Sequence, residues 1–477
     1  MHLTRREFVR SAVALAVVPV PGRMAFPAGR LRGVPRPVPT PSQLRWQREE
    51  TALFIHFGIN TFTDREWGDG SESPALFDPA ALDARQWVRA ARAAGAGSLI
   101  LTAKHHDGFC LWPTATTRHS VAASPWKGGS GDVMREFVDA CRAEGLGAGV
   151  YLSPWDRNAP SYGSGRAYDD LYIAQLSELL TRYGPMVEVW FDGANGEGPN
   201  GKRQAYDWPR IHRTVRSLQP DAVIFSDAGP DVRWIGNERG VAGETCWSTI
   251  DPAAVPYPGY SAPGVSELLQ RGDPHGSVWR PGETDVSIRP GWFWHPEEED
   301  RVRTVENLVD LHFTSVGRNS KLLLNVPPTR EGRLGPVDVA RLEGFGQAVR
   351  AMYATDLLAD SRGSGSAAAR LVDGEPDTWW SPPGPDGRTG SVELALPAAA
   401  RCSVVCLEEA IAHGQVVEGY RVDARVSGVW RAVARGTTIG HRKLDRIAPV
   451  TTDRIRLTID RALGVPRIAR LSLHLVA

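Results

Sequence analysis

Cysteine is scarce in this sequence, and the few cysteines make no recognisable framework. Five cysteines lie at positions 110, 141, 246, 402 and 406, an odd number separated by wide intervals. No two of them form a Cys-x-x-Cys pair, which is the usual start of a structural zinc site. The cysteines therefore indicate neither a disulfide scaffold nor a zinc module.

An excess of charge of one sign is also lacking. Lysine plus arginine and aspartate plus glutamate both number 55, so the formal net charge at pH 7 is +0. Proteins that hold nucleic acids concentrate positive charge on one face or in one segment. We therefore expect no nucleic-acid partner.

Long hydrophobic runs are missing as well, and the most apolar stretch lies at the start of the chain. It covers residues 11–20 and follows Thr4-Arg5-Arg6-Glu7-Phe8. A bilayer span needs about 20 apolar residues, so this run is too short to be one. Paired arginines before a short apolar run are typical of a twin-arginine export signal. We predict an export signal over residues 1–30, a periplasmic or extracellular location and no membrane span; an ordinary secretion signal with a chance arginine pair is the alternative.

The sequence after the signal predicts a proline-rich linker and then a large α/β domain. Prolines alternate through residues 31–42, and residues 43–355 alternate short apolar segments with helical patterns. The segments that we expect to be strands are 53–55, 98–102, 149–152, 187–191, 222–225 and 321–324. Apolar strands between helices predict a parallel sheet covered on both faces, and the length suits a (β/α)8-type barrel with long loops. A doubly wound sheet is the alternative, but no glycine-rich dinucleotide turn follows the first segment.

Residues 356–477 show a different pattern, in which apolar residues recur at every second position. The triplets Val392-x-Leu394-x-Leu396 and Ile455-x-Leu457-x-Ile459 are examples. This period predicts antiparallel strands in a β-sandwich. Residues 371–380 are similar to the opening of discoidin-like sandwiches, which either bind sugars or support a neighbouring barrel, and both roles stay open.

Histidines, carboxylates and tryptophans gather where the expected barrel strands end, which is where barrel enzymes place their active sites. The groups are His56-Phe57-Gly58, Glu66-Trp67, Lys104-His105-His106-Asp107-Gly108-Phe109, Tyr151 and Trp190-Phe191-Asp192-Gly193. Taken singly, a carboxylate at a strand end most often caps a helix. Adjacent histidines on a strand point to opposite sides, so we expect no shared metal ion. Together, neutral imidazoles and aromatic plates suit a polyhydroxylated ligand with apolar faces, and the chain holds 16 tryptophans.

These motifs, in this order, resemble glycoside hydrolase family 29, the α-L-fucosidases, from about Trp46 to Tyr353. The resemblance implies a cofactor-free, metal-independent retaining exo-α-L-fucosidase in which Asp192 is the nucleophile. A retaining glycosidase needs a second carboxyl group about 5–5.5 Å from the first. The residues that the resemblance assigns to the fucose pocket are His56, Glu66, Trp67, His105, His106, Tyr151 and Trp190, with Trp292 or Trp294 closing it against the methyl group.

The resemblance places the acid/base residue at Glu238. The run Trp234-Ile235-Gly236-Asn237-Glu238-Arg239-Gly240, after the fifth expected strand, resembles the subgroup that acts on α-1,3/1,4-fucosyl branches. Glu244 and Glu283 are the competing carboxyl groups. The implied partner is a fucosylated oligosaccharide or glycoconjugate. The alternative functions are a retaining exo-glycosidase for another sugar and a catalytically silent glycan-binding protein.

Overall fold

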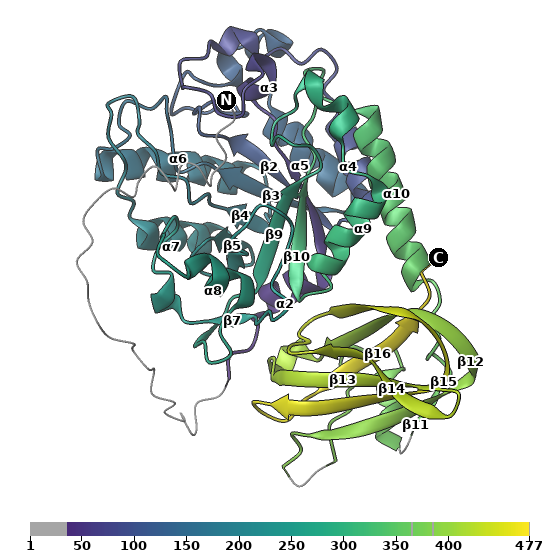
Figure 1. The fold of residues 1–477 in the computed structure, drawn as a ribbon. Helices are drawn as coiled ribbons and strands as arrows, with labels where there is room; N and C mark the ends of the chain where they lie inside the picture. The colour runs from purple at the N-terminus through teal and green to yellow at the C-terminus, as the bar shows by residue number, and fades with distance from the viewer. Residues whose placement is uncertain (1–35, 364–365, 384–385, 477) are drawn as a thin grey trace.

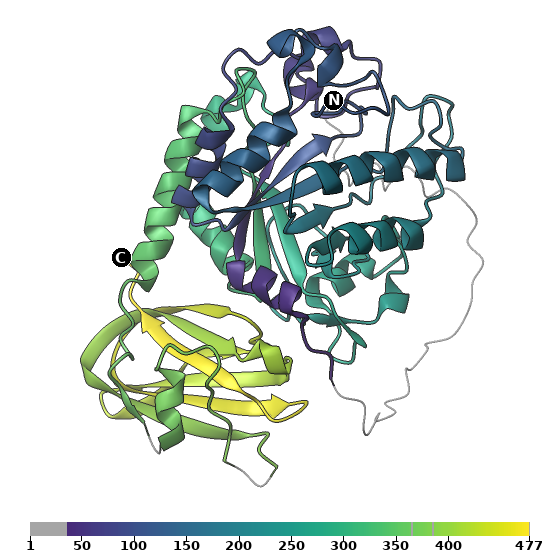
Figure 2. The ribbon, with the colours of Figure 1, turned by 180° about the vertical axis from the view of Figure 1, so that it is seen from behind.

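The computed structural model describes residues 36–363, 366–383 and 386–476. Eight parallel strands close into a barrel, and an antiparallel β domain follows it (Figure 1, Figure 2). The predicted (β/α)8-type barrel with a C-terminal antiparallel domain is thus confirmed. The predicted export signal lies outside the described residues. Within the described part of the chain, no helix combines the length and the apolar character that a membrane span requires.

The barrel strands follow each other around the barrel in the order β1-β10-β9-β6-β5-β4-β3-β2. They are β1 (Thr51–Ile55), β2 (Ser98–Lys104), β3 (Gly147–Leu152), β4 (Glu188–Trp190), β5 (Val223–Ser226), β6 (Val232–Trp234), β9 (Gly282–Ser287) and β10 (Ser320–Asn325). The helices are α2 (Pro41–Glu49), α3 (Ile59–Thr63), α4 (Ala84–Ala94), α5 (Val133–Glu144), α6 (Arg166–Arg182), α7 (Trp208–Leu218), α8 (Val265–Arg271), α9 (Val305–Thr314) and α10 (Pro336–Tyr353).

The covering helices start and stop at local signals in the sequence. Asp83 caps α4 by accepting a hydrogen bond from the Gln86 N–H, and Asp132 caps α5 in the same way. Both helices end at a glycine in the left-handed conformation, Gly95 and Gly145. A glycine adopts that conformation without the steric cost of a side chain. The caps fix where each helix begins, and the buried face of each helix then packs on the barrel.

Two barrel strands, β6 and β9, were not among the predicted segments. β9 reads Gly-Glu-Thr-Asp-Val-Ser, and all six residues are buried. β6 has three residues and carries Arg233, whose guanidinium is buried and donates to the carbonyl oxygens of Leu269 and Trp247. Polar residues with buried partners break the apolar pattern that identifies a strand in a sequence. The short connection from β5 to β6, residues 227–231, also lacks the expected helix.

The two ends of the barrel differ in what closes them. Helix α2 lies at the end beside the β domain, whereas α3 lies at the opposite end (Figure 1). Trp46 of α2 is buried in the barrel and its indole Nε1–H donates to Glu188 Oε2 at 2.8 Å. Because the strands run parallel, their carboxyl ends meet at the α3 end. The motif residues after these strands therefore share that end, away from the β domain.

The β domain is one antiparallel sheet with the order β11-β12-β15-β13-β14, in which β16 also pairs with β12. Its strands are β11 (Arg362–Gly363), β12 (Gly390–Glu409), β13 (Val417–Val426), β14 (Val429–Gly436), β15 (Lys443–Ala462) and β16 (Ile468–His474). Strands β12 and β15 have 20 residues each, and register shifts interrupt their pairing. Such bulges bend strands, and buried Leu394, Leu457 and Ile459 form part of the core. A separate two-stranded sheet in the barrel region joins β7 (Thr249–Ile250) and β8 (Val278–Trp279).

The β domain contacts the barrel through a half-buried ion pair and through an amide. Glu50 accepts hydrogen bonds from Arg442 Nη1 and His441 Nε2, both at 2.9 Å. The Gln415 side chain accepts from the Ser248 N–H at 2.8 Å and donates to the Cys246 carbonyl at 3.0 Å. The sequence left open whether this domain binds sugars or supports the barrel, and these contacts favour support of the barrel.

We expect the Glu50 ion pair to stabilise the protein in a pH-dependent way. Burial alone would raise the pKa of Glu50, but the charge of Arg442 and the hydrogen bond from His441 outweigh it and lower the pKa from 4.5 to about 2. A carboxylate whose pKa is lowered in the folded state stabilises the folded protein at pH values above the pKa that it has in the unfolded chain. This stabilisation is lost as the pH falls through the pKa of the folded state. Glu50→Gln should therefore lower the free energy of unfolding by roughly 3 kcal/mol at pH 7. Urea unfolding of both proteins should show this difference shrinking between about pH 4.5 and pH 2.

Glu343→Gln is the matched control, because Glu343 is an exposed glutamate on α10. Its free energy of unfolding should stay within about 0.5 kcal/mol of wild type. A Glu50→Gln deficit that is the same at every pH would contradict the ionic origin of the effect.

Candidate active site

Asp192 lies two residues beyond the end of β4, and its side chain is nearly buried, with the residue 8% exposed. The Tyr151 hydroxyl on β3 donates to Asp192 Oδ2 at 3.1 Å, and the Ala194 N–H donates to Oδ1 at 2.8 Å. His106 Nε2 is 3.8 Å from Oδ2. Hydrogen bonds to both oxygens stabilise the carboxylate, which is the form that an attacking oxygen requires. Asp192 does not cap the following helix, which is the role that a carboxylate at a strand end most often has; Asp207 caps α7.

The tautomer of His56 follows from its neighbours. Its Nδ1 lies 2.8 Å from Asn325 Oδ1. The amide of Asn325 donates to Ser287 Oγ at 2.9 Å and to the Trp292 carbonyl at 2.8 Å, which fixes Oδ1 as the acceptor. Nδ1 of His56 is therefore the donor. Burial lowers the pKa of His56 to about 3, so the ring is neutral and its Nε2 is an acceptor.

His106 has the same tautomer for a similar reason. Its Nδ1 is 2.7 Å from Ser153 Oγ, and the Ser153 hydroxyl donates its proton to the Trp155 carbonyl at 2.6 Å. Ser153 Oγ therefore accepts a hydrogen bond from the Nδ1–H of His106, and this tautomer carries its proton on Nδ1. The neutral His56 ring, with its acceptor nitrogen, suits a hydroxyl donor such as those of a sugar.

His105 and His106 do not point to opposite sides, as the sequence had suggested. Strand β2 ends at Lys104, so the alternation of a strand does not apply to these residues. Their ring centroids are 4.1 Å apart. His105 stacks 5.8 Å from the Tyr151 ring, and His106 lies 4.9 Å from the Trp155 ring. The structure therefore gathers both histidines near Tyr151 and Trp155, with His106 beside Asp192.

Aromatic side chains surround this group. Trp190 stacks on Phe225 with the ring centroids 4.1 Å apart, and it lies 5.3 Å from Tyr151. Trp292 lies 5.1 Å from the His56 ring, and Trp67 lies 5.9 Å from the His106 ring. These tryptophans therefore line the site with the histidines.

Trp294 does not join the group. Its Nε1–H donates to Glu299 Oε1 at 3.2 Å, and Glu299 also pairs with Arg289. Of the two tryptophans predicted to close the pocket, the structure brings Trp292 to the histidines.

Glu66 lies beside the aromatic group, and its carboxylate already accepts hydrogen bonds from other residues of the protein. Its oxygens accept hydrogen bonds from the Trp292 N–H at 2.9 Å and the Phe293 N–H at 3.1 Å. His295 Nε2 lies 2.7 Å from Glu66 Oε1. Glu66 therefore joins the segment after β1 to the segment after β9, whether or not it also meets a ligand.

The three carboxyl groups considered for acid/base catalysis lie in different surroundings. Glu238 is half-buried and follows β6, the sixth strand in the chain and not the fifth. Glu244 is 86% exposed and pairs with Arg318 at 3.8 Å, and its neighbour Thr245 bonds to Thr437 of the β domain. Glu244 therefore lies on the β-domain side of the barrel.

Glu283 lies inside the barrel, beneath the pocket. Its Oε1 accepts from the Trp190 indole at 3.0 Å, and the residue has no solvent exposure. Burial, and secondly the charge of Glu188, raise the pKa of Glu283 well above its usual range. Glu283 therefore supports Trp190 from below, and among the three groups Glu238 is the one that follows a barrel strand at the motif end.

The sequence did not reveal several residues that complete this site. Asn325 orients His56, Ser153 orients His106, and the Phe293 ring contacts both His56 and His105 at 5.5 and 5.0 Å. Asp285 of β9 accepts from the Trp234 indole at 2.7 Å. Of these, Asn325 and Ser153 carried a usable signal, because each directly follows an apolar segment in the same way as the motif residues.

Groups that could bind a metal ion are not apparent: among the residues that the structure describes, no three His, Cys, Asp or Glu side chains cluster suitably.

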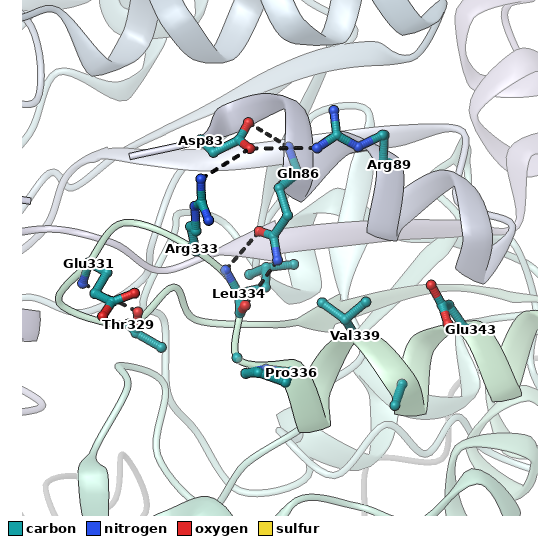
Figure 3. Close-up of a pocket in the computed structure, with 12 residues that line it drawn as sticks. Asp83, Gln86, Arg89, Thr329, Glu331, Arg333, Leu334, Pro336, Val339 and Glu343 are labelled. Atoms are coloured by element: carbon teal, nitrogen blue, oxygen red, sulfur yellow. Dashed lines mark hydrogen bonds and ion pairs between the residues drawn. The ribbon is translucent and has the colours of Figure 1, made fainter. Parts of the chain in front are cut away.

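A separate surface pocket lies between the starts of α4 and α10, and no predicted site residue lines it (Figure 3). Several of its polar groups bond to each other: the Gln86 amide exchanges two hydrogen bonds with the Leu334 backbone, and Asp83 pairs with Arg89 and Arg333. We assign no function to it.

Comparisons with known proteins agree on one family. The family model for α-L-fucosidases matches residues 43–352. α-L-Fucosidase 1 of Arabidopsis thaliana is 41% identical over 453 residues, which cover 92% of this chain and 88% of the plant protein. The solved structure of a glycoside hydrolase 29 family member from an unknown rumen bacterium is 39% identical, with a TM-score of 0.83 and coverage of 93% of this chain and 78% of that one.

A second solved structure is that of a Ruminococcus gnavus family 29 fucosidase in complex with fucose. It is 33% identical to this chain, with a TM-score of 0.84, and the match covers 93% of this chain and 96% of that one. The similarity therefore extends through the barrel and the β domain.

Proposed function

Because this chain belongs to glycoside hydrolase family 29, the α-L-fucosidases, we propose that it is a retaining exo-enzyme that removes terminal α-1,3/1,4-linked L-fucose with Asp192 as nucleophile and Glu238 as acid/base. The observation that carries the proposal is the placement of Asp192 at the carboxyl end of β4. There, hydrogen bonds from Tyr151 and the Ala194 N–H hold both of its oxygens.

In the first step, a carboxylate oxygen of Asp192 attacks the anomeric carbon from the face opposite to the leaving group. The bond between that carbon and the glycosidic oxygen breaks, and its electron pair leaves with the oxygen. Glu238 gives its proton to this oxygen. The product is a β-linked fucosyl ester on Asp192, and Glu238 is now a carboxylate.

In the second step, Glu238 takes a proton from a water molecule as the water oxygen attacks the anomeric carbon. The ester bond breaks and its electrons return to Asp192. Two inversions restore the α-configuration of the released fucose. Neutral His56 accepts a hydrogen bond from a sugar hydroxyl throughout, and Trp292 covers the pocket.

The linkage preference rests on the run Trp234 to Gly240, which resembles the α-1,3/1,4 subgroup. We expect the enzyme to release fucose from Lewis-type trisaccharides with a kcat/KM at least about tenfold higher than from an α-1,2-fucosylated lactose. Fucose release, measured by mass spectrometry, gives both values. Asp192→Ala controls for contaminating activity.

Equal or faster cleavage of the α-1,2 linkage would contradict the subgroup assignment while leaving the fucosidase activity in place. A panel of aryl glycosides tests the alternative of another sugar. Binding of fucosylated glycans without any fucose release would indicate the silent glycan-binding protein instead.

A further inference from the structure

Two side chains hold the backbone of Trp292, one at its N–H and the other at its carbonyl. The Trp292 N–H donates to Glu66 Oε2 at 2.9 Å, and its carbonyl accepts from Asn325 Nδ2 at 2.8 Å. Asn325 also holds His56, whose ring lies 5.1 Å from the Trp292 indole. The position of Glu66 therefore decides where Trp292 stands relative to the pocket histidine.

Glu66 is in turn held by His295, which lies between two carboxylates. His295 Nε2 is 2.7 Å from Glu66 Oε1, and its Nδ1 is 2.7 Å from Asp64 Oδ1. A neutral imidazole has one N–H and donates to one of these groups, whereas an imidazolium donates to both. The geometry therefore suits the charged ring, which joins the segment after β1 to the segment after β9.

The packing around this contact is tight. A Cβ atom on Gly291 would lie 2.5 Å from Glu66 Oε1 and 2.8 Å from His295 Cδ2. The Gly291 N–H also donates to Glu298 Oε2 at 3.1 Å, and its carbonyl accepts from Ser287 Oγ at 2.6 Å. The backbone before Trp292 is thus fixed against the carboxylate that His295 binds.

We propose that His295 is a positioning residue for the fucosidase reaction: as an imidazolium held between Asp64 and Glu66, it locks Glu66 onto the Trp292 segment and so sets Trp292 over the pocket. His295 acts through Glu66 and Trp292 and does not itself meet the sugar. The expected effect on kcat/KM rests on the proposed function. The expected effect on hydrogen exchange of the Trp292 segment rests on the structure alone.

The charge on His295 gives this lock a pH dependence. The charged groups that act on the ring are Glu66, Asp64 and Glu298; the hydrogen bond to Glu66 contributes most, and together they raise the pKa of His295 to about 9. A histidine with a raised folded-state pKa holds its partners at low pH and releases them as the pH rises through the folded value. We expect the lock to be intact at pH 7 and to open above about pH 9.

His295→Gln and Asp64→Asn test the proposal. The glutamine side chain carries no charge, so in His295→Gln the kcat/KM for an aryl α-L-fucoside should fall about 10- to 100-fold at pH 7. The alkaline limb that His295 adds near pH 9, beyond the limb that Glu238 sets as general acid, should vanish. Asp64→Asn is the milder variant, because Asp64 is half exposed. It should keep most of the activity and move the alkaline limb to lower pH, since one of the two carboxylates that raise the pKa of His295 is gone.

Hydrogen exchange of the Trp292 and Phe293 amides is the readout that does not depend on activity. Both amides should exchange faster in the His295→Gln variant, and in the wild type above pH 9 by more than the intrinsic rate increase. His275→Gln, at an exposed histidine, is the matched control and should behave as wild type.

Unchanged exchange together with an unchanged pH profile in both variants would overturn the proposal. A lower melting temperature with wild-type kinetic constants would do the same, because it would show a purely structural role. Should the wild type itself release no fucose, the proposed function fails, and the exchange experiment still decides whether His295 locks the segment.

Discussion

Replacing Asp192 by glycine should lower kcat for an activated aryl α-L-fucoside by about 10⁴-fold or more, because the reaction loses the group that forms the covalent bond. Asp192 accepts hydrogen bonds from Tyr151 and from a backbone N–H, so the substitution removes the carboxylate without removing these donors. Azide should enter the space left and attack the anomeric carbon on the same face. Turnover should then return, with β-fucosyl azide as the product, identified by NMR.

Glu197→Gln is the control for this experiment, since Glu197 is an exposed carboxylate in the same loop. It should keep kcat within about twofold of wild type, as expected for a surface substitution. Near-normal activity of Asp192→Gly, or rescue that yields α-fucosyl azide, would show that another group is the nucleophile.

Replacing Glu238 by alanine should have an effect that depends on the leaving group. A general acid contributes about 10²- to 10⁴-fold, and a natural sugar alcohol needs this proton far more than an activated phenol does. We therefore expect kcat/KM for a Lewis-type trisaccharide to fall about 10³-fold, and that for an activated aryl fucoside to fall by less than about tenfold. Azide should speed turnover of the aryl substrate by attacking the fucosyl-enzyme, and here the product should be α-fucosyl azide.

Glu244→Gln is the matched control, because Glu244 is the exposed competitor on the β-domain side of the barrel. It should leave both substrates unaffected. An equal loss on both substrates in Glu238→Ala, without azide rescue, would indicate a binding role for Glu238 and would remove it from the acid/base position.

The parts of the fold that could be predicted are those whose burial shows as apolar sequence. Strands β1, β2 and β10 contain apolar runs, and the sequence identifies them. Strand β9 could not be found in this way, because its Glu283 and Asp285 are buried and bond to tryptophans of β4 and β6, far away in the sequence. A polar residue with a buried partner looks like a loop residue until its partner is known.

The residues of the candidate site likewise fall into those that the sequence identifies and those that it does not. Asp192, His56 and Tyr151 stand directly after or within apolar strands, so their order along the chain indicated a common site. The groups that orient them come from elsewhere: Asn325 is 269 residues from His56. His295 is 229 residues from Glu66, and no local pattern shows such a pair. The spacing of motifs predicts which side chains meet, but the hydrogen bonds that set their tautomers and charges depend on the tertiary structure.

The identity of the nucleophile is tested most directly by trapping the covalent intermediate. A 2-deoxy-2-fluoro-fucosyl fluoride forms the fucosyl-enzyme but slows its hydrolysis, and peptide mass spectrometry of the inactivated protein locates the ester. We predict one fluorofucosyl group per chain, attached to Asp192 in the peptide that contains Trp190-Phe191-Asp192-Gly193. A label on Glu238, Asp285 or any other residue, or inactivation without a covalent label, would contradict the account.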